Sequence, residues 1–411
     1  MKEIIFRSIF CFILSIFLIG KTKAQPVLIF QSGFEGSTKV VMNPGTNDYG
    51  APLEHITGID NTFSVKNNWT TDWAAVNGGN MQVQYTGGDS TKRFAKVIPE
   101  PGNTSNKVLQ YWLNDSWLAS EGQYKSRIQT NLYGIKGGYK DFYQSVRMFL
   151  TADFNQLKSY PNIINWLTIS EFWNNEWWVT NEPYGFRVTL GIGKPTSATS
   201  ELNFILNAEN AGQVEVWKGN NTNIKVPIGK WFTMEYYFKE GNKQTGQFWM
   251  AITPDGGSKQ VVFDIHNFTH NTSDPAPNGL TGYNPMKLYT SNEVVAFVKS
   301  KGKTLQVYWD DFKLWKNKQP EISTSVNNIN TNIQQEIKIF PNPSTDFVVL
   351  EGINIDSKIE LYDILGNIVI SQIANTNDTK IDLSILEPGI YFYKIIARDK
   401  SSQTGKLIKN N

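Results

Sequence analysis

The stretch YKSRIQT at residues 124–130 alternates polar and apolar side chains. Successive side chains of a β-strand point to opposite faces, so this period predicts a strand with Lys125, Arg127 and Gln129 on one face. Comparable short runs recur from Val27 to Trp315, separated by glycine, asparagine, proline and aspartate turns, and helical periodicity is scarce. The pattern predicts an all-β body, an antiparallel sandwich of many short strands.

The first residues predict the compartment. Lys2 and Arg7 precede an apolar run at residues 9–20. The small residues Thr22 and Ala24 follow that run. That order is typical of a secretory signal peptide, here residues 1–24, rather than of an uncleaved membrane anchor. No later stretch is apolar enough to predict a transmembrane segment. The only cysteine, Cys11, lies inside the signal, so the mature chain is expected to have neither a disulfide nor a cysteine metal site.

Charge indicates the class of partner of the remaining chain, and composition indicates its domain boundaries. Four of the 39 basic residues and one of the 37 acidic residues lie in the signal, so the mature chain is nearly neutral, which does not favour nucleic acid as a partner. All 13 tryptophans lie between Trp69 and Trp315, and the segment after them is rich in Asn, Ser and Thr without aromatic residues. We predict a body at 25–317, a linker at 318–335 and a C-terminal domain at 336–411.

The C-terminal domain carries several ordered motifs. They are Pro341-Asn342-Pro343, Leu361-Tyr362-Asp363 with Gly366, Pro388-Gly389-Ile390-Tyr391 and Lys406-Leu407-Ile408. Over about its whole length this segment resembles the C-terminal sorting domain of the bacterial type IX secretion system. The resemblance implies a small β-sandwich and export across the outer membrane to the surface or beyond, with the secretion machinery as a partner. The alternative is an ordinary sandwich domain that binds a partner or a sugar.

The tryptophan content of the body favours carbohydrate as a partner, because a sugar ring stacks on an aromatic face while its hydroxyls pair with planar polar groups. Trp173, Trp177 and Trp178 alternate with Asn and Glu, and Trp117 lies in a second cluster of this kind. These four are the predicted sugar-binding rings. The alternative is that the rings fill the core, which we favour for five tryptophans inside strands: Trp166, Trp231, Trp249, Trp309 and Trp315.

The body also resembles the concanavalin-like jelly-roll family, which includes many polysaccharide lyases. The resemblance is carried by Ser32-Gly33-Phe34-Glu35, Lys125–Gln129, Ile228–Phe232, Gly246–Trp249 and Tyr308–Phe312. It implies a jelly-roll fold, common to catalytic and non-catalytic members.

A lyase must neutralise a uronate carboxylate, remove the C5 proton and protonate the leaving oxygen. Arg127, with Lys125 and Gln129 beside it, would suit the floor of a sugar-binding surface, although a solvated outer face explains the same pattern. Arg187 is a further candidate for binding an anion. His266 and Tyr283 are candidates for proton transfer.

A hydrolase would need two facing carboxylates, and Glu171 is the best single acid. Alternation places Glu171 on the same face as Leu167, Ile169 and Trp173. The resemblance to carbohydrate-binding jelly rolls suggests a structural calcium ion held by Asp310 and Asp311. The alternative is that one of these aspartates accepts hydrogen bonds from a neighbouring turn.

Together these features predict a secreted protein that acts on polysaccharide, with a lyase for an anionic glycan as the leading hypothesis. A non-catalytic carbohydrate-binding protein or adhesin, a glycoside hydrolase using Glu171, and a purely structural surface protein remain as alternatives.

Overall fold

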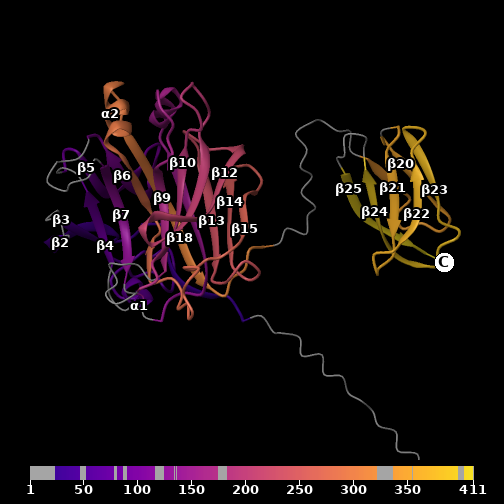
Figure 1. Ribbon diagram of the computed structural model, residues 1–411, viewed down its shortest axis with the longest axis horizontal. Helices are drawn as coiled ribbons and strands as arrows, with labels where there is room; N and C mark the ends of the chain where they lie inside the picture. Colours follow the sequence, from indigo (N-terminus) through magenta and orange to yellow (C-terminus); the bar gives the residue numbers. More distant parts are fainter. Residues whose placement is uncertain are drawn as a thin grey trace, which may run out of the picture. The chain divides into compact units, whose positions relative to one another are not determined.

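The computed structural model describes residues 24–46, 52–77, 81–86, 90–115, 125–133, 135, 137–174, 183–321, 337–353, 355–396 and 402–410. The chain divides into two compact units, Met1–Pro320 and Glu321–Asn411 (Figure 1). We call the first the body and the second the C-terminal domain. The predicted linker at 318–335 and the predicted signal peptide fall almost entirely outside the described residues.

An eight-stranded antiparallel sheet forms one layer of the body. Its order is β15-β14-β13-β8-β18-β6-β5, and β1 also pairs with β18. The strands are β1 (Val27–Ser32), β5 (Arg93–Glu100), β6 (Asn103–Leu113), β8 (Asp141–Leu150), β13 (Trp231–Lys239), β14 (Gln247–Pro254), β15 (Gln260–His266) and β18 (Leu305–Lys316).

A ten-stranded antiparallel sheet forms the other layer. Its order is β12-β11-β10-β9-β16-β7-β4-β3-β2, and β17 pairs with both β7 and β9. The strands are β2 (Lys39–Thr46), β3 (Pro52–Thr57), β4 (Met81–Thr86), β7 (Lys125–Tyr133), β9 (Leu167–Asn174), β10 (Phe186–Gly193), β11 (Asn203–Asn210), β12 (Val214–Lys225), β16 (Gly282–Asn284) and β17 (Lys287–Ser291).

Helices in the body are short: α1 (Asp72–Asn77), α2 (Asn292–Ser300) and the 3-10 turns η2 (Ala152–Ser159) and η3 (Ala211–Gln213). Ser291 caps α2, because its hydroxyl accepts a hydrogen bond from the backbone N–H of Val294. Within the described residues no helix is long and apolar enough to cross a membrane.

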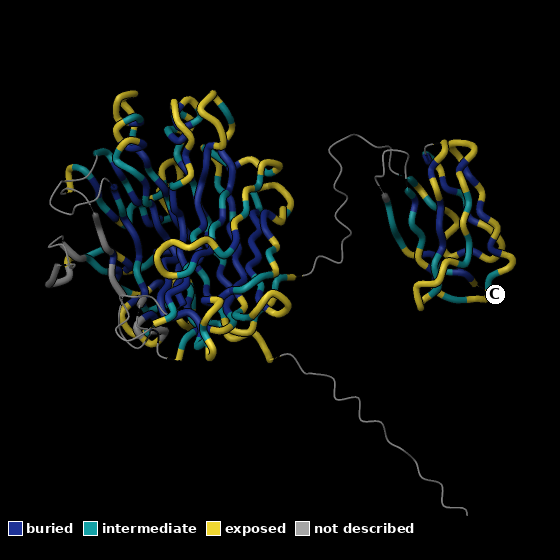
Figure 2. Tube along the Cα trace, viewed as in Figure 1, coloured by how far each residue is buried: buried dark blue, intermediate teal, exposed yellow. Residues whose placement is uncertain are grey.

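The core lies between the two sheets, because each strand turns one apolar side inward. Buried residues run along the strands of the body, and exposed residues gather in its loops (Figure 2). Ile128 and Leu132 of β7 face Val146 and Met148 of β8 across one continuous cluster. At one end of it five fully buried rings pack together: Phe30, Phe34, Trp69, Trp73 and Phe312. Burying each such ring stabilises the fold by about 1.5–3 kcal/mol.

The C-terminal domain has two small sheets, β19-β20-β23 and β22-β21-β24-β25. Their strands are β19 (Lys338–Phe340), β20 (Phe347–Glu351), β21 (Lys358–Tyr362), β22 (Ile368–Ile373), β23 (Asp378–Asp382), β24 (Gly389–Ile396) and β25 (Ser402–Lys409). A separate core, including Leu350, Ile359, Ile381 and Leu407, holds them together. The predicted fold class, an antiparallel jelly-roll sandwich followed by a small β-sandwich, is confirmed.

The expectation that five strand tryptophans fill the core holds only for Trp309, which is completely buried between the sheets. Trp249 is also buried, but in a smaller cluster with Tyr143 and Tyr237, outside the main core. Trp166, Trp231 and Trp315 are only half-buried. Alternation assigns residues to two faces but does not say which face is inner when both carry aromatic rings.

Candidate functional site

A β-bulge in β9 decides which side chains of that strand face outward. The pairing with β10 runs Ser170↔Leu190 and then Thr168↔Gly191, so Ile169 is the extra residue. Leu167 and Ile169 point into the core, whereas Glu171 pairs with Thr189 and lies on the opposite face. The prediction that Glu171 shares a face with Leu167 and Ile169 is therefore wrong. A bulge adds one residue to a strand and reverses the alternation beyond it.

Polar side chains from five neighbouring strands meet on this outward side of the ten-stranded sheet. Cross-strand pairing places Gln129 opposite Lys287, Arg127 opposite Tyr289, and Arg187 opposite Trp173. Directly paired residues project to the same side of a sheet. We call the following set the polar face: Lys125, Arg127, Gln129, Glu171, Trp173, Arg187, Glu209, Lys287 and Tyr289.

A buried ion pair lies at the centre of the polar face. Lys287 Nζ donates to Glu171 Oε2, and the two side chains are 2% and 3% exposed. Burial lowers the pKa of Lys287 to about 7, against the opposing effect of Glu171 and with a further lowering by Arg127 and Arg187. This amine therefore exchanges its proton near neutral pH.

The Tyr289 ring is surrounded by cations. Lys287 Nζ lies 4.7 Å from the ring centroid, while Lys125 Nζ and the Arg127 guanidinium carbon each lie 5.5 Å from it. Tyr289 and Arg127 are half-buried, in contrast to the fully enclosed Lys287. A molecule approaching the polar face would therefore meet the phenol and the guanidinium before the buried pair.

A second ion pair lies further along the same face. Arg187 Nε donates to Glu209 Oε1, and the guanidinium carbon lies 5.1 Å from the Trp173 ring centroid. Trp173 is 5% exposed, so its ring supports Arg187 more than it offers a free stacking surface. Over the whole polar face four cationic side chains stand against two carboxylates, which favours an anionic ligand.

The buried polar atoms at this site that have no hydrogen-bond partner among the described residues include Arg127 Nε and Asn284 Oδ1, and Asn284 pairs with Glu171 across the sheet. Arg127 also forms no ion pair with any described residue, unlike Arg187 and Lys287. Buried polar groups are normally paired, so an uncompensated guanidinium is available for a ligand carboxylate.

The structure does not bring the predicted Tyr283 and His266 to the polar face. Tyr283 is 1% exposed and packs in the core against Phe142 and Phe172, because it pairs with the inward residue Phe172. His266 ends β15 in the other sheet, where its exposed ring lies 3.2 Å from Asp264. The predicted sugar-binding residues Trp117, Trp177 and Trp178 lie outside the described residues.

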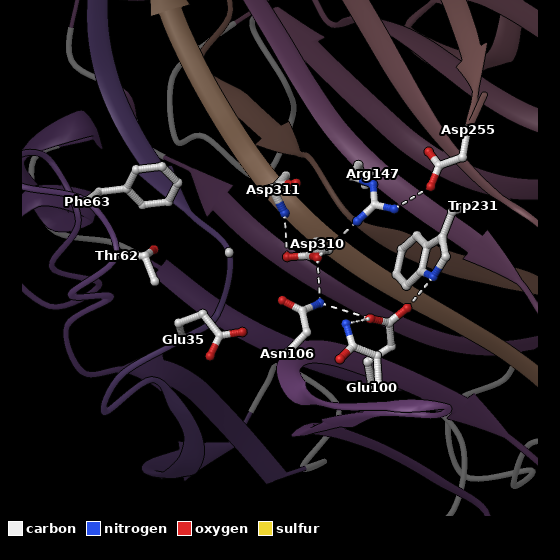
Figure 3. A pocket seen from close by; sticks show the side chains of 12 residues that line it. Glu35, Thr62, Phe63, Glu100, Asn106, Arg147, Trp231, Asp255, Asp310 and Asp311 are labelled. Atoms are coloured by element: carbon white, nitrogen blue, oxygen red, sulfur yellow. Dashed lines mark hydrogen bonds and ion pairs between the residues drawn. The ribbon is translucent and has the colours of Figure 1, made fainter. Parts of the chain in front are cut away.

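Asp310 and Asp311 belong to the eight-stranded sheet and line a pocket there (Figure 3). Asp310 is 3% exposed, accepts hydrogen bonds from Asn106 and the backbone N–H of Asp311, and lies 3.4 Å from Arg147. Burial raises the pKa of Asp310 to about 7. No group of three or more His, Cys, Asp or Glu that could hold a metal ion occurs in the described part of the chain. Asp310 accepts these hydrogen bonds from strand β6 and from the next residue in the chain rather than from a turn, and calcium binding stays a prediction.

Sequence reasoning missed Lys287 and Tyr289. The run Met286-Lys287-Leu288-Tyr289-Thr290 alternates like residues 124–130, and this signal could have placed both side chains on one face. Its pairing with β7 could not be read from the sequence, because the two strands lie more than 150 residues apart.

Comparison with known protein families identifies the C-terminal domain. Residues 338–410 match the family model of the secretion system C-terminal sorting domain, so the predicted type IX sorting domain is confirmed. No curated protein matches the chain.

Solved structures similar to the body include three lyases. The PL-14 alginate lyase from Aplysia kurodai is 11% identical, with 54% of this chain and 87% of that chain covered and a TM-score of 0.36. The endo-beta-1,4-glucuronan lyase from Trichoderma reesei is 12% identical, with 56% and 94% covered and a TM-score of 0.32. The exolytic PL7 alginate lyase AlyA5 from Zobellia galactanivorans is 11% identical, with 56% and 89% covered and a TM-score of 0.30.

Proposed function

We propose that the body is a polysaccharide lyase that cleaves an anionic, uronate-containing glycan on the polar face, and that the sorting domain directs its export. The observation that carries the proposal is Arg127, a guanidinium without an anionic partner among the described residues, beside the half-buried phenol of Tyr289. A guanidinium binds a carboxylate in a planar two-bond geometry, which fits recognition of a uronate.

The reaction is a β-elimination. Arg127, with the Gln129 amide beside it, binds the uronate carboxylate and stabilises the negative charge that develops when C5 loses its proton. The C4–O bond then breaks, a C4=C5 double bond forms, and the leaving oxygen takes up a proton. No oxidant or added water is needed.

Tyr289 is the group proposed to exchange protons with the sugar, because its hydroxyl-bearing ring is the accessible acid–base group of the face. Lys287 is proposed as a positioning residue. It lies against the Tyr289 ring and, with its pKa lowered by burial to about 7, can hold or release a proton near neutrality.

The test is absorbance from new double bonds during incubation with alginate, glucuronan and neutral glycans. Wild type should generate the signal on a uronate glycan, and Tyr289→Phe should lower kcat by about 10²–10⁴-fold, the usual contribution of a proton-transfer group. Tyr308→Phe is the matched control, because Tyr308 is also a half-buried tyrosine but lies in the other sheet.

A wild-type protein that yields no double bonds on any uronate glycan refutes the lyase. Retained binding of the uronate glycan, lost in Arg127→Ala, would then favour the non-catalytic carbohydrate-binding protein. Release of reducing ends without double bonds, lost in Glu171→Gln, would favour the hydrolase.

A further inference from the structure

A row of aromatic side chains crosses the outward face of the eight-stranded sheet, the layer opposite the polar face. Trp231 of β13 pairs with Phe149 of β8, and Phe149 pairs with Tyr308 of β18. The ring centroids of Phe149 lie 5.4 Å from Trp231 and 5.8 Å from Tyr308. We call these three residues the aromatic row. Because neighbouring strands are about 4.8 Å apart, the row extends over roughly 10 Å in a straight line.

The aromatic row is half-buried, whereas the rings at the other end of the same face are enclosed. There Tyr143, Tyr237 and Trp249 are at most 5% exposed. Lys318, from the segment that follows β18, lies 4.4 Å from the Tyr143 ring centroid and 4.0 Å from that of Trp315. Lys318 thus covers part of the enclosed half of this aromatic surface, whereas the aromatic row keeps its three rings half-buried, with Arg147 against the Trp231 ring.

A pocket of about 600 Å³ adjoins the aromatic row and shares Trp231 with it (Figure 3). The Trp231 ring is held in place, since its Nε1 donates to Glu100 at 2.5 Å and the Arg147 guanidinium lies 4.7 Å from its centroid. Arg147 is itself paired with Asp255 at 2.6 Å. A ring fixed in this way loses little conformational freedom when a ligand stacks on it.

The charge of the pocket selects the class of ligand. Its lining has one cation, Arg147, and five carboxylates: Glu35, Glu100, Asp255, Asp310 and Asp311. Such a surface repels a uronate chain, in contrast to the cation-rich polar face. Carboxylate oxygens and the Asn106 amide oxygen instead accept hydrogen bonds from hydroxyl groups, while Asn106 Nδ2 already donates to Glu100 and Asp310.

We infer that the aromatic row and its pocket form a second glycan-binding site, for a neutral polysaccharide chain that lies across Trp231, Phe149 and Tyr308. The site would hold the protein on a neutral glycan while the polar face acts on an anionic one. It stands on its own residues and does not depend on the lyase proposal.

Native affinity electrophoresis of the mature chain in gels containing hydroxyethylcellulose, mannan, laminarin or alginate tests this inference. Wild type should be retarded by at least one of the three neutral glycans. Trp231→Ala and Tyr308→Ala should each bind roughly tenfold more weakly, with Trp231→Phe in between. Arg127→Ala, on the polar face, should migrate like wild type in the neutral gels.

Three results would overturn the inference: no retardation by any neutral glycan, equal retardation of wild type and both alanine variants, or retardation by alginate alone. Retardation abolished equally in every variant by EDTA would also overturn it, because a cation would then replace the rings as the binding element. Circular dichroism of each variant checks its fold, and Trp231→Phe keeps the test decisive if an alanine variant is unfolded. If the protein forms no double bonds on uronate glycans, the lyase proposal is refuted. The results expected in the neutral-glycan gels stay the same in that case.

Discussion

Removing the buried amine of Lys287 should destabilise the body strongly. Lys287→Met leaves the Glu171 carboxylate, 3% exposed, without its direct partner. Loss of one member of a buried ion pair costs about 3–5 kcal/mol. Arg127 and Arg187 lie close enough to affect Lys287 electrostatically, so they still act on Glu171 in the variant. We therefore expect the lower end, about 3 kcal/mol, at a pH below 7, where the Lys287 amine is protonated.

Replacing both partners should cost much less. In Lys287→Met with Glu171→Leu no buried charge is left unpaired, and such replacements are often close to neutral. The matched control is Lys218→Met, which breaks the exposed pair of Lys218 and Glu215 and should cost less than about 1 kcal/mol. Denaturant unfolding followed by tryptophan fluorescence reports on the body alone, because all 13 tryptophans lie there.

The reasoning fails if Lys287→Met costs no more than Lys218→Met, or if the double variant loses as much stability as the single one. The pH dependence of the unfolding free energy provides a second test. Because the native pKa of Lys287, about 7, lies below its ordinary 10.5, the unfolded chain binds more protons between these values. Unfolding free energy should rise with pH in this window, by up to about 1.4 kcal/mol per pH unit, and this slope should vanish in Lys287→Met.

Three further outcomes are expected. Asp310 has a native pKa near 7, above its ordinary 3.8, so the native state binds more protons between these values. Stability should therefore fall as pH rises from about 4 to 7, with a smaller slope in Asp310→Asn, measured by thermal unfolding at several pH values. Deleting Ile169 removes the bulge and exchanges the two faces over one half of β9, so the rate of double-bond formation and the melting temperature should both drop. An unchanged rate would contradict the proposed role of the bulge. A chain ending at Pro320 should stay inside the producing cell, and its appearance in the medium at the full-length level would argue against the sorting role.

The all-β fold and the sorting domain could be predicted from the sequence because their signals are local. Alternation over five to ten residues fixes a strand and its two faces, as it did for Arg127 and Gln129. The motifs around Pro341 and Gly389 lie in order within one short domain. Such features need no knowledge of which distant strands pair.

The tertiary structure alone decided which residues share the candidate site. Tyr283 and Tyr289 lie on β16 and β17, which are consecutive in the chain, but pairing turns Tyr283 into the core and Tyr289 toward Arg127. One inserted residue, Ile169, carries Glu171 to the polar face, although alternation predicts the opposite. The physical reason is that strand register is set by packing between residues far apart in the chain, and a shift of one residue exchanges the two faces.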